Sequence, residues 1–197
     1  METLKRINEI TNPDHRNTLF QRYDHVLDAI RKTNLDDIYA IASKYSLHVG
    51  VPEDVRSTYA IAQNMYAFSW FYYPFNSEAG LVALRATERA LKLCMNMEKS
   101  RIGLKKLVIE ATKRDLLSED NYTKPAYVEY SSNGKGNNSQ SSYISKLPDI
   151  LSVLRNNAAH GDSCIHWYGE LILRLTAETI NQLFICPEEF PSSGGKE

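Results

Sequence analysis

The sequence predicts an all-α fold, and three observations support this prediction. Apolar residues recur at spacings of three and four through most of the chain, which is the period of one helix face. Residues that commonly begin or end helices stand at the ends of these stretches. No stretch of useful length alternates apolar and polar residues as a half-buried strand does. With 197 residues, 43% of them hydrophobic, the chain is long enough to form one domain around its own core.

Three helices are expected in the first part of the chain. Residues 19–32 place five apolar side chains at helical spacing, so a helix is expected there. Asn34 is expected to cap a second, shorter helix that ends before Gly50. Pro52 and the two acidic residues after it favour the start of a third helix, because proline and negative charge suit the first helical turn.

The third helix leads into an aromatic cluster, which Pro74 is expected to kink or divide. The cluster falls on several helix faces and forms no single stripe. This distribution favours a place in the core or in a dimer interface over the stacking of unpaired bases. The aromatic cluster comprises Tyr66, Phe68, Trp70, Phe71, Tyr72, Tyr73 and Phe75.

The second part of the chain is expected to be helical as well, with one break. Residues 77–97 repeat the helical spacing, and Gly103 begins a further helix. Residues 131–142 contain no hydrophobic residue at all. Such a segment cannot bury enough surface to offset its ordering entropy, so a mobile polar loop is expected there.

Two helices and a tail are expected to close the chain. The first is short and covers residues 147–154, and the second reaches from about residue 165 to Phe184. The tail at 186–197 is expected to be frayed. The turn between these two helices carries the most informative motif of the sequence.

The net charge of −1 hides a local excess of positive charge. Residues 85–114, here called the basic segment, contain nine basic and three acidic residues. A basic segment in a nearly neutral protein can bind a polyanion. It can equally be the solvated face of a helix.

Composition and missing motifs exclude several classes of protein. No apolar run approaches the ~18–20 residues that a membrane-spanning helix needs, and the first residues lack the apolar stretch of a signal peptide. The three cysteines are far apart and form no C-x-x-C pair, which favours a reducing cytoplasmic location over a disulfide framework. Phosphate-binding glycine loops, nucleophile elbows and dinucleotide fingerprints are also missing.

Residues 154–162, LRNNAAHGD, contain the pattern R-N-x-x-x-H between the last two predicted helices. Its members are Arg155, Asn156 and His160, and the residues after the histidine favour a tight turn followed by a helix start. One interpretation is structural, with Arg155 and Asn156 capping carbonyl groups at the helix end. The other is chemical, because arginine and histidine together suit catalysis on a phosphate.

The sequence here resembles the HEPN superfamily of small helical-bundle proteins. The hallmark of that family is an arginine, a polar residue that is often asparagine, three residues and a histidine, just before the last long helix. LRNNAAHG at 154–161 matches it, while LVALRATERALKLCM at 81–95 and LKKLVIEATKRDLL at 104–117 are similar to the family's early core helices. The resemblance covers residues 58–185 and implies a HEPN-like helical core, with residues 1–57 as an N-terminal helical extension.

The resemblance implies a metal-independent endoribonuclease without a cofactor, active as a homodimer whose two motifs face each other. Arg155, Asn156 and His160 would then be the catalytic residues. Glu88, which lies inside an otherwise apolar helix face, either pairs with Arg155 and positions it or forms an ordinary exposed ion pair. Asn157 is a second supporting candidate. The side chains of the basic segment that are expected to contact RNA are Arg85, Arg89, Lys92, Lys105 and Lys106.

The family also leaves an alternative of a different class, a catalytically silent scaffold that binds nucleic acid, a nucleotide or a partner protein. Its active members suggest a setting in defence or a toxin–antitoxin system, with an antitoxin or effector protein as a possible partner. In toxins of this family that a partner nucleotidyltransferase modifies, a tyrosine commonly stands two residues after the histidine. Asp162 occupies that position here, so control by tyrosine modification is not expected.

A zinc site is the competing interpretation of the same region. His160, Cys164 and His166 form the pattern H-x3-C-x-H. If the last helix begins near residue 163, Cys164 and His166 point about 200° apart and do not share an ion easily. The spacing also offers no fourth ligand, so no metal is expected.

Overall fold

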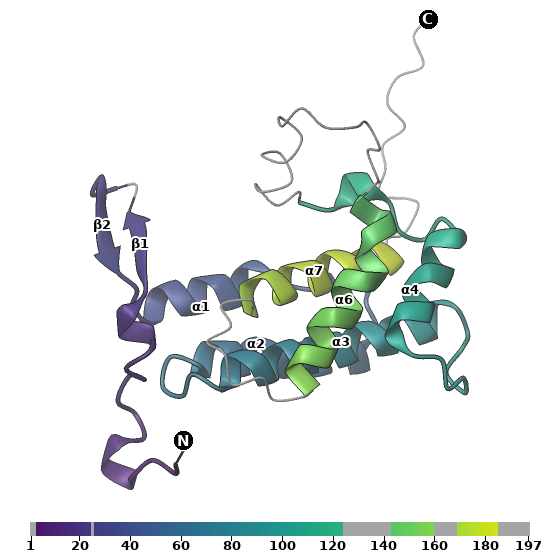
Figure 1. Ribbon diagram of the computed structural model, residues 1–197. Helices are drawn as coiled ribbons and strands as arrows, with labels where there is room; N and C mark the ends of the chain where they lie inside the picture. The colour runs from purple at the N-terminus through teal and green to yellow at the C-terminus, as the bar shows by residue number, and fades with distance from the viewer. Residues whose placement is uncertain (1–2, 25, 124–142, 160–168, 185–197) are drawn as a thin grey trace, which may run out of the picture.

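The computed structural model describes residues 3–24, 26–123, 143–159 and 169–184, and the rest of the chain is drawn as a grey trace (Figure 1). Within these ranges the chain is mostly helical, as predicted, and it also contains one two-stranded sheet. None of the described helices is long and apolar enough to cross a membrane. The predicted loop at 131–142 and the predicted tail at 186–197 lie outside the described residues.

The prediction of a helix over residues 19–32, and with it the expectation that no strand is present, was wrong. Strands β1 (Gln21–Asp24) and β2 (Ala29–Lys32) pair antiparallel, with Arg22 opposite Arg31. The hairpin projects from one end of the molecule (Figure 1). The apolar side chains that suggested a helix have no core to bury against, and Val26 is 93% exposed.

Local hydrogen bonds stabilise the hairpin turn in place of a helix. The carboxylate of Asp24 accepts the backbone N–H groups of Val26 and Leu27, at 2.9 and 3.1 Å. Asp28 adopts a φ of 50°, the left-handed region that aspartate tolerates better than most residues and that no helix interior uses. These contacts reverse the chain within the turn, so the two strands can pair.

The helix starts predicted from capping residues are confirmed. Helix α1 (Leu35–Lys44) begins with a capping box: the N–H of Asp37 donates to the Asn34 side chain, and the N–H of Asn34 donates to the Asp37 carboxylate. Helix α2 (Glu53–Phe68) starts directly after Pro52, and helix α3 (Phe75–Cys94) starts after Pro74, so this second proline divides the predicted helix.

Three further helices complete the described core. Helix α4 (Leu104–Lys113) follows Gly103, as predicted. Helix α6 (Tyr143–Ala159) extends beyond the predicted 147–154 at both ends and contains Pro148 in its second turn. Arg155 and Asn156, expected in the turn after this helix, therefore lie within it. Helix α7 (Gly169–Leu183) supplies the last described element, and short 3-10 turns occur at Ile7–Glu9 (η1), Asn17–Leu19 (η2) and Glu119–Asn121 (η3).

Helix α3 lies at the centre, and α2, α4, α6 and α7 all pack against it (Figure 1). Small residues on α3 permit the close approach of α7, since a Cβ atom at Gly80 would lie only 2.8 Å from Cδ1 of Ile172. Ile38 and Ala42 of α1 belong to the same buried core as the residues of α3 and α7. The helix at 35–44 therefore packs on the main helices and shares their core.

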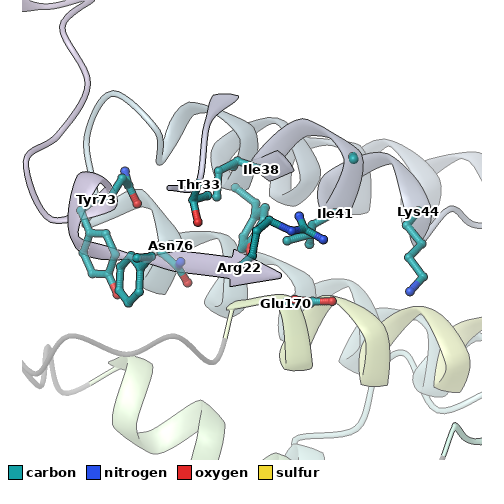
Figure 2. A pocket seen from close by; sticks show the side chains of 12 residues that line it. Arg22, Thr33, Ile38, Ile41, Lys44, Tyr73, Asn76 and Glu170 are labelled. Atoms are coloured by element: carbon teal, nitrogen blue, oxygen red, sulfur yellow. The ribbon is translucent and has the colours of Figure 1, made fainter. Parts of the chain in front are cut away.

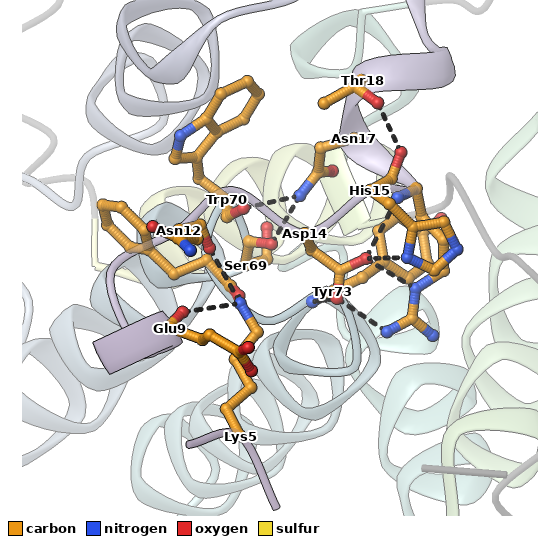
Figure 3. A network of polar contacts seen from close by, with 12 residues as sticks. Lys5, Glu9, Asn12, Asp14, His15, Asn17, Thr18, Ser69, Trp70 and Tyr73 are labelled. Atoms are coloured by element: carbon orange, nitrogen blue, oxygen red, sulfur yellow. Dashed lines mark hydrogen bonds and ion pairs between the residues drawn. The ribbon is translucent and has the colours of Figure 1, made fainter. Parts of the chain in front are cut away.

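Side chains between residues 5 and 17 bind the turn between α2 and α3 (Figure 3). Asp14, with 4% of its surface exposed, accepts the backbone N–H of Tyr73 at 3.0 Å and pairs with Arg16 at 2.7 Å. The side-chain amide of Asn17 donates to the carbonyl oxygens of Ser69 and Trp70. These bonds satisfy backbone groups that the break between the two helices leaves without helical partners.

The aromatic cluster of residues 66–75 contributes to this junction. The predicted place in the core is confirmed for Tyr66, Trp70 and Tyr73, which are buried. Phe68 remains 55% exposed. Because the cluster spans a helix end, a turn and a helix start, its members point in different directions.

Candidate functional site

Arg155 and Asn156 lie near the C-terminal end of α6, and both side chains are exposed. In the described part of the chain, no residue forms an ion pair or hydrogen bond with the Arg155 guanidinium. His160 and the side chain of Asn157 lie outside what the structure describes. The first two members of the motif are thus neighbours on one helix end, ahead of α7.

Glu88 has a partner on its own helix. Its carboxylate accepts from Nζ of Lys92 at 2.7 Å, one helical turn further along α3, and both side chains are partly buried. No hydrogen bond or ion pair joins Glu88 to Arg155 among the described residues. Lys92, expected to contact RNA, is therefore already engaged by a carboxylate.

The other basic residues expected to contact RNA divide into two groups. Arg89 pairs with Asp54 at 3.0 Å and Lys105 pairs with Asp149 at 2.5 Å, and all four side chains are about half exposed or more. Such exposed pairs typically contribute only ~0.2–1 kcal/mol, so a phosphate group can replace the carboxylate at little cost.

Arg85 on α3 and Lys106 on α4 form the second group. Both are exposed, and neither has an ion-pair partner in the described ranges. Among the described residues, the five candidates for RNA contact therefore comprise two unpaired cations, two cations in exposed pairs and one in a partly buried pair.

The alternative zinc ligands His160, Cys164 and His166 all lie outside the described residues. Within the described ranges, no group of three histidine, cysteine or acidic side chains is arranged to hold a metal ion. The one cysteine described, Cys94, is half-buried and close to the carbonyl oxygen of Leu183 at 3.4 Å.

A cleft of about 410 Å³ lies between the hairpin, α1, the start of α3 and the start of α7 (Figure 2). Sequence reasoning did not predict it, because its walls come from segments up to 150 residues apart. No local pattern joins these segments, and only the packing of α1 and the hairpin onto the helical core brings them together. The lining residues are Asn17, Phe20, Arg22, Thr33, Ile38, Ala40, Ile41, Lys44, Tyr66, Tyr73, Asn76 and Glu170.

Arg22, which lines the cleft, belongs to an ion-pair network around Asp37. The Asp37 carboxylate receives hydrogen bonds from Arg31, at 2.6 and 2.8 Å, and from Arg22, at 3.1 Å. The hydrogen bonds from Arg31 lower the pKa of Asp37 to about 2, because they favour the charged carboxylate and outweigh the opposing effect of burial. This network holds Arg22 at the edge of the cleft.

One wall of the cleft presents polar groups from α2, α3 and α7. Asn76 is 9% exposed, and its side-chain amide has no hydrogen-bond partner among the described residues. Burial raises the pKa of the Tyr66 hydroxyl above its ordinary value, and the negative charge of Glu170 raises it further. Glu170 itself accepts a hydrogen bond from the Tyr45 hydroxyl at 3.2 Å.

The start of α7 packs tightly against this wall. A Cβ atom at Gly169 would overlap Oδ1 of Asn76 and would lie 2.7 Å from the Tyr66 ring. The glycine at this position therefore allows the helix start to reach the cleft.

No family model, curated protein or solved structure matches the chain. The resemblance to the HEPN superfamily rests on residues of the sequence, above all on the R-N-x-x-x-H pattern at 155–160. It stays a prediction.

Proposed function

We propose that the chain is a metal-independent endoribonuclease of the HEPN type, which cuts RNA at a site shared across a homodimer. The observation that supports this most is the state of Arg155. Its guanidinium is exposed at the end of α6 and has no partner in the described ranges, so it is free to bind a phosphate. An arginine that capped carbonyl groups of α6, the structural interpretation, would instead be hydrogen-bonded to them.

The chemistry follows from the three side chains of the motif. One imidazole removes the proton from the ribose 2′-hydroxyl, whose oxygen forms a new bond to phosphorus. The bond between phosphorus and the 5′-oxygen breaks, and a second imidazole gives that oxygen a proton. Histidine suits both roles because its reference pKa of ~6.5 lies close to neutral pH, and each role typically accelerates a reaction by ~10²–10⁴.

Arg155 and Asn156 would support the imidazoles without exchanging protons. The permanent charge of Arg155 would stabilise the negative charge that grows on the phosphoryl oxygens. Asn156 would orient His160 or hydrogen-bond the phosphate. Since each chain has one motif, a second copy related by two-fold symmetry would supply the second histidine.

We further propose that RNA reaches this site along the basic segment. Arg85 and Lys106 would contact RNA phosphates directly, and Arg89 and Lys105 would exchange their exposed carboxylate partners for phosphates. A defence or toxin–antitoxin setting, with a partner protein that neutralises the activity, is the biological context that the family resemblance suggests.

The test is an RNA-cleavage assay in the presence of EDTA, with analysis of the product ends. We expect wild-type protein to leave a 2′,3′-cyclic phosphate and a 5′-hydroxyl, and we expect His160→Ala and Arg155→Ala to lose cleavage. Arg6→Ala, which removes an exposed arginine outside both the motif and the basic segment, serves as the control and should retain it.

Two further readouts separate catalysis from structure. Both motif variants should keep the helical circular dichroism and the melting temperature of wild type. Arg155 is exposed, and changes at exposed positions usually alter stability by less than ~0.5 kcal/mol. Loss of cleavage in EDTA, products with 5′-phosphates, or a lower melting temperature in both variants would contradict the proposal.

A further inference from the structure

The cleft between the hairpin and the start of α7 has two chemically different ends (Figure 2). Tyr73 and Asn76 lie at one end, while Lys44 and Glu170 lie toward the other, with Arg22 reaching in from the hairpin. A volume of about 410 Å³ is within the range of ~300–1,000 Å³ that is usual for small-molecule sites.

The first end combines aromatic surface with one unsatisfied amide. Phe20 and Tyr73 stack on each other, with ring centroids 6.1 Å apart and an angle of 16° between the rings. Beside them, the buried Asn76 amide turns toward the cleft and has no partner among the described residues (Figure 2). The amide can therefore bond a ligand that offers both a donor and an acceptor. The Tyr73 hydroxyl beside it is buried and has no partner among the described residues, which costs free energy that a bound ligand would recover.

The edge of a nucleobase carries hydrogen-bond donors and acceptors that match those of an asparagine amide. The amide has one acceptor and two donors, and its most frequent bidentate partner among the bases is adenine. The partly exposed Phe20 ring, which lines the cleft, supplies a flat apolar surface for the face of the base. This end of the cleft therefore suits a purine.

The second end presents two cations and one carboxylate. Arg22 forms one hydrogen bond in the described structure, to Asp37, which leaves other N–H groups of its guanidinium available. Lys44 lies over the Tyr45 ring at 5.2 Å and has no carboxylate partner in the described ranges. A phosphate group fits between these cations, because both can donate charge-assisted hydrogen bonds to its oxygens.

Glu170 adds a requirement for hydroxyl groups near the phosphate. Only one of its carboxylate oxygens has a hydrogen bond, from Tyr45. A carboxylate beside a phosphate subsite would repel a bare polyanion but would accept hydrogen bonds from ribose hydroxyls, as acidic residues do in dinucleotide-binding folds.

From these three features we infer that the cleft binds a ribonucleoside 5′-monophosphate, with the base at Asn76, the ribose hydroxyls at Glu170 and the phosphate between Arg22 and Lys44. This site is separate from the motif at 155–160 and does not depend on ribonuclease activity. It adds a second, reversible ligand to a chain whose proposed substrate is a polymer.

Isothermal titration calorimetry of the full chain with AMP, GMP, CMP and UMP tests the inference. We expect one saturable site per chain, with AMP bound most tightly. Adenosine should bind more weakly than AMP because it lacks the phosphate, and inorganic phosphate should bind more weakly because it lacks the base. If none of the four nucleotides saturates a site, the inference is overturned.

A matched pair of variants isolates the phosphate contact. Lys44 is the last residue of the ten-residue helix α1, and Lys113 is the last residue of the ten-residue helix α4, and both are exposed. Lys44→Gln and Lys113→Gln therefore remove the same favourable interaction with a helix C-terminus. We expect Lys44→Gln to weaken the binding of AMP roughly tenfold, because hydrogen bonds between charged groups are stronger than those between neutral groups. The affinity for adenosine, which has no phosphate, should not change. Lys113→Gln should bind AMP as wild type does.

Asn76→Ala tests the base contact. It should lower the affinities for AMP and for adenosine by the same factor. Its melting temperature is measured alongside, and if this variant does not fold, the comparison of Lys44→Gln with Lys113→Gln still decides. Equal affinities for AMP and adenosine, equal affinities for AMP and inorganic phosphate, or equal losses in the two lysine variants would each overturn the assignment.

Discussion

The carboxylate of Asp14 accepts the backbone N–H of Tyr73 at 3.0 Å, although 58 residues of chain separate the two. Arg16 holds that carboxylate from the other side, and its guanidinium also lies over the Tyr73 ring at 5.1 Å. Tyr73 ends the turn between α2 and α3, so these contacts connect the N-terminal segment to the point where these two helices meet.

We expect Asp14→Ala to lower the free energy of unfolding by about 2 kcal/mol, because hydrogen bonds to charged groups contribute ~1.5–3 kcal/mol and a buried N–H would lose its acceptor. Urea denaturation followed by circular dichroism measures the change. Asp120→Ala, at an exposed position, is the control and should unfold as wild type does. A loss no larger than that of the control would mean that the N-terminal segment does not stabilise the core.

Acid should weaken the same region before it weakens the helices. Burial alone would raise the pKa of Asp14, but hydrogen bonds from the Arg16 side chain and from backbone N–H groups outweigh it and hold the pKa well below its usual range. The pKa of Asp37 is also lowered, to about 2. Because both folded-state values lie below the unfolded value of ~3.9, the stabilisation is complete above that value and is lost as the pH falls through it toward 2.

Melting temperatures between pH 7 and pH 2.5 test this dependence. The melting temperature of wild type should be nearly constant down to about pH 5 and should then fall. The double variant Asp14→Asn, Asp37→Asn should have a lower melting temperature at pH 7. Its melting temperature should also fall less in acid, because both carboxylates are gone. Parallel curves for the two proteins would show that other groups dominate the acid response.

Gly169→Ala should destabilise the protein by roughly 1–3 kcal/mol, the usual cost of overfilling a packed site. The new Cβ atom would overlap Oδ1 of Asn76 and approach the Tyr66 ring. Gly80→Ala is the comparison: its Cβ would meet only the end of the Ile172 side chain, and alanine favours a helix interior by ~1 kcal/mol over glycine. Thermal unfolding of both variants should therefore rank Gly169→Ala as the less stable, and the reverse order would refute this packing argument.

Dimer dependence of RNA cleavage can be measured by mixing chains. If two motifs share one site, an excess of Arg155→Ala chains should capture wild-type chains in damaged heterodimers and depress activity below simple dilution. The matched mixture with Arg6→Ala chains should not depress activity below simple dilution. Activity strictly proportional to the amount of wild-type chain, or cleavage by a monomer at working concentration, would exclude the shared site.

Much of the helical framework could be predicted from short stretches of sequence. Asn34 at the start of α1, Pro74 at the division between α2 and α3 and Gly103 before α4 were all assigned correctly. Each of these signals acts within one helical turn, through a capping hydrogen bond, a missing N–H or a relaxed backbone. Arg155 and Asn156, in contrast, were expected in the turn between the last two helices, but α6 continues to Ala159 and includes both. The position of His160 lies outside the described residues.

The contacts of the hairpin at 21–32 with α1 and the cleft beside it were decided by tertiary structure. The helical spacing of Tyr23 and Ile30 was a true pattern, but no apolar surface of the core faces it, so a helix there would have gained nothing from packing. The strands instead bring Arg22 and Arg31 to one buried carboxylate, Asp37, on a different element. Local sequence determines which backbone hydrogen bonds are favourable within a few residues, whereas an ion pair or a cleft depends on where distant elements meet, and only the folded core sets those positions.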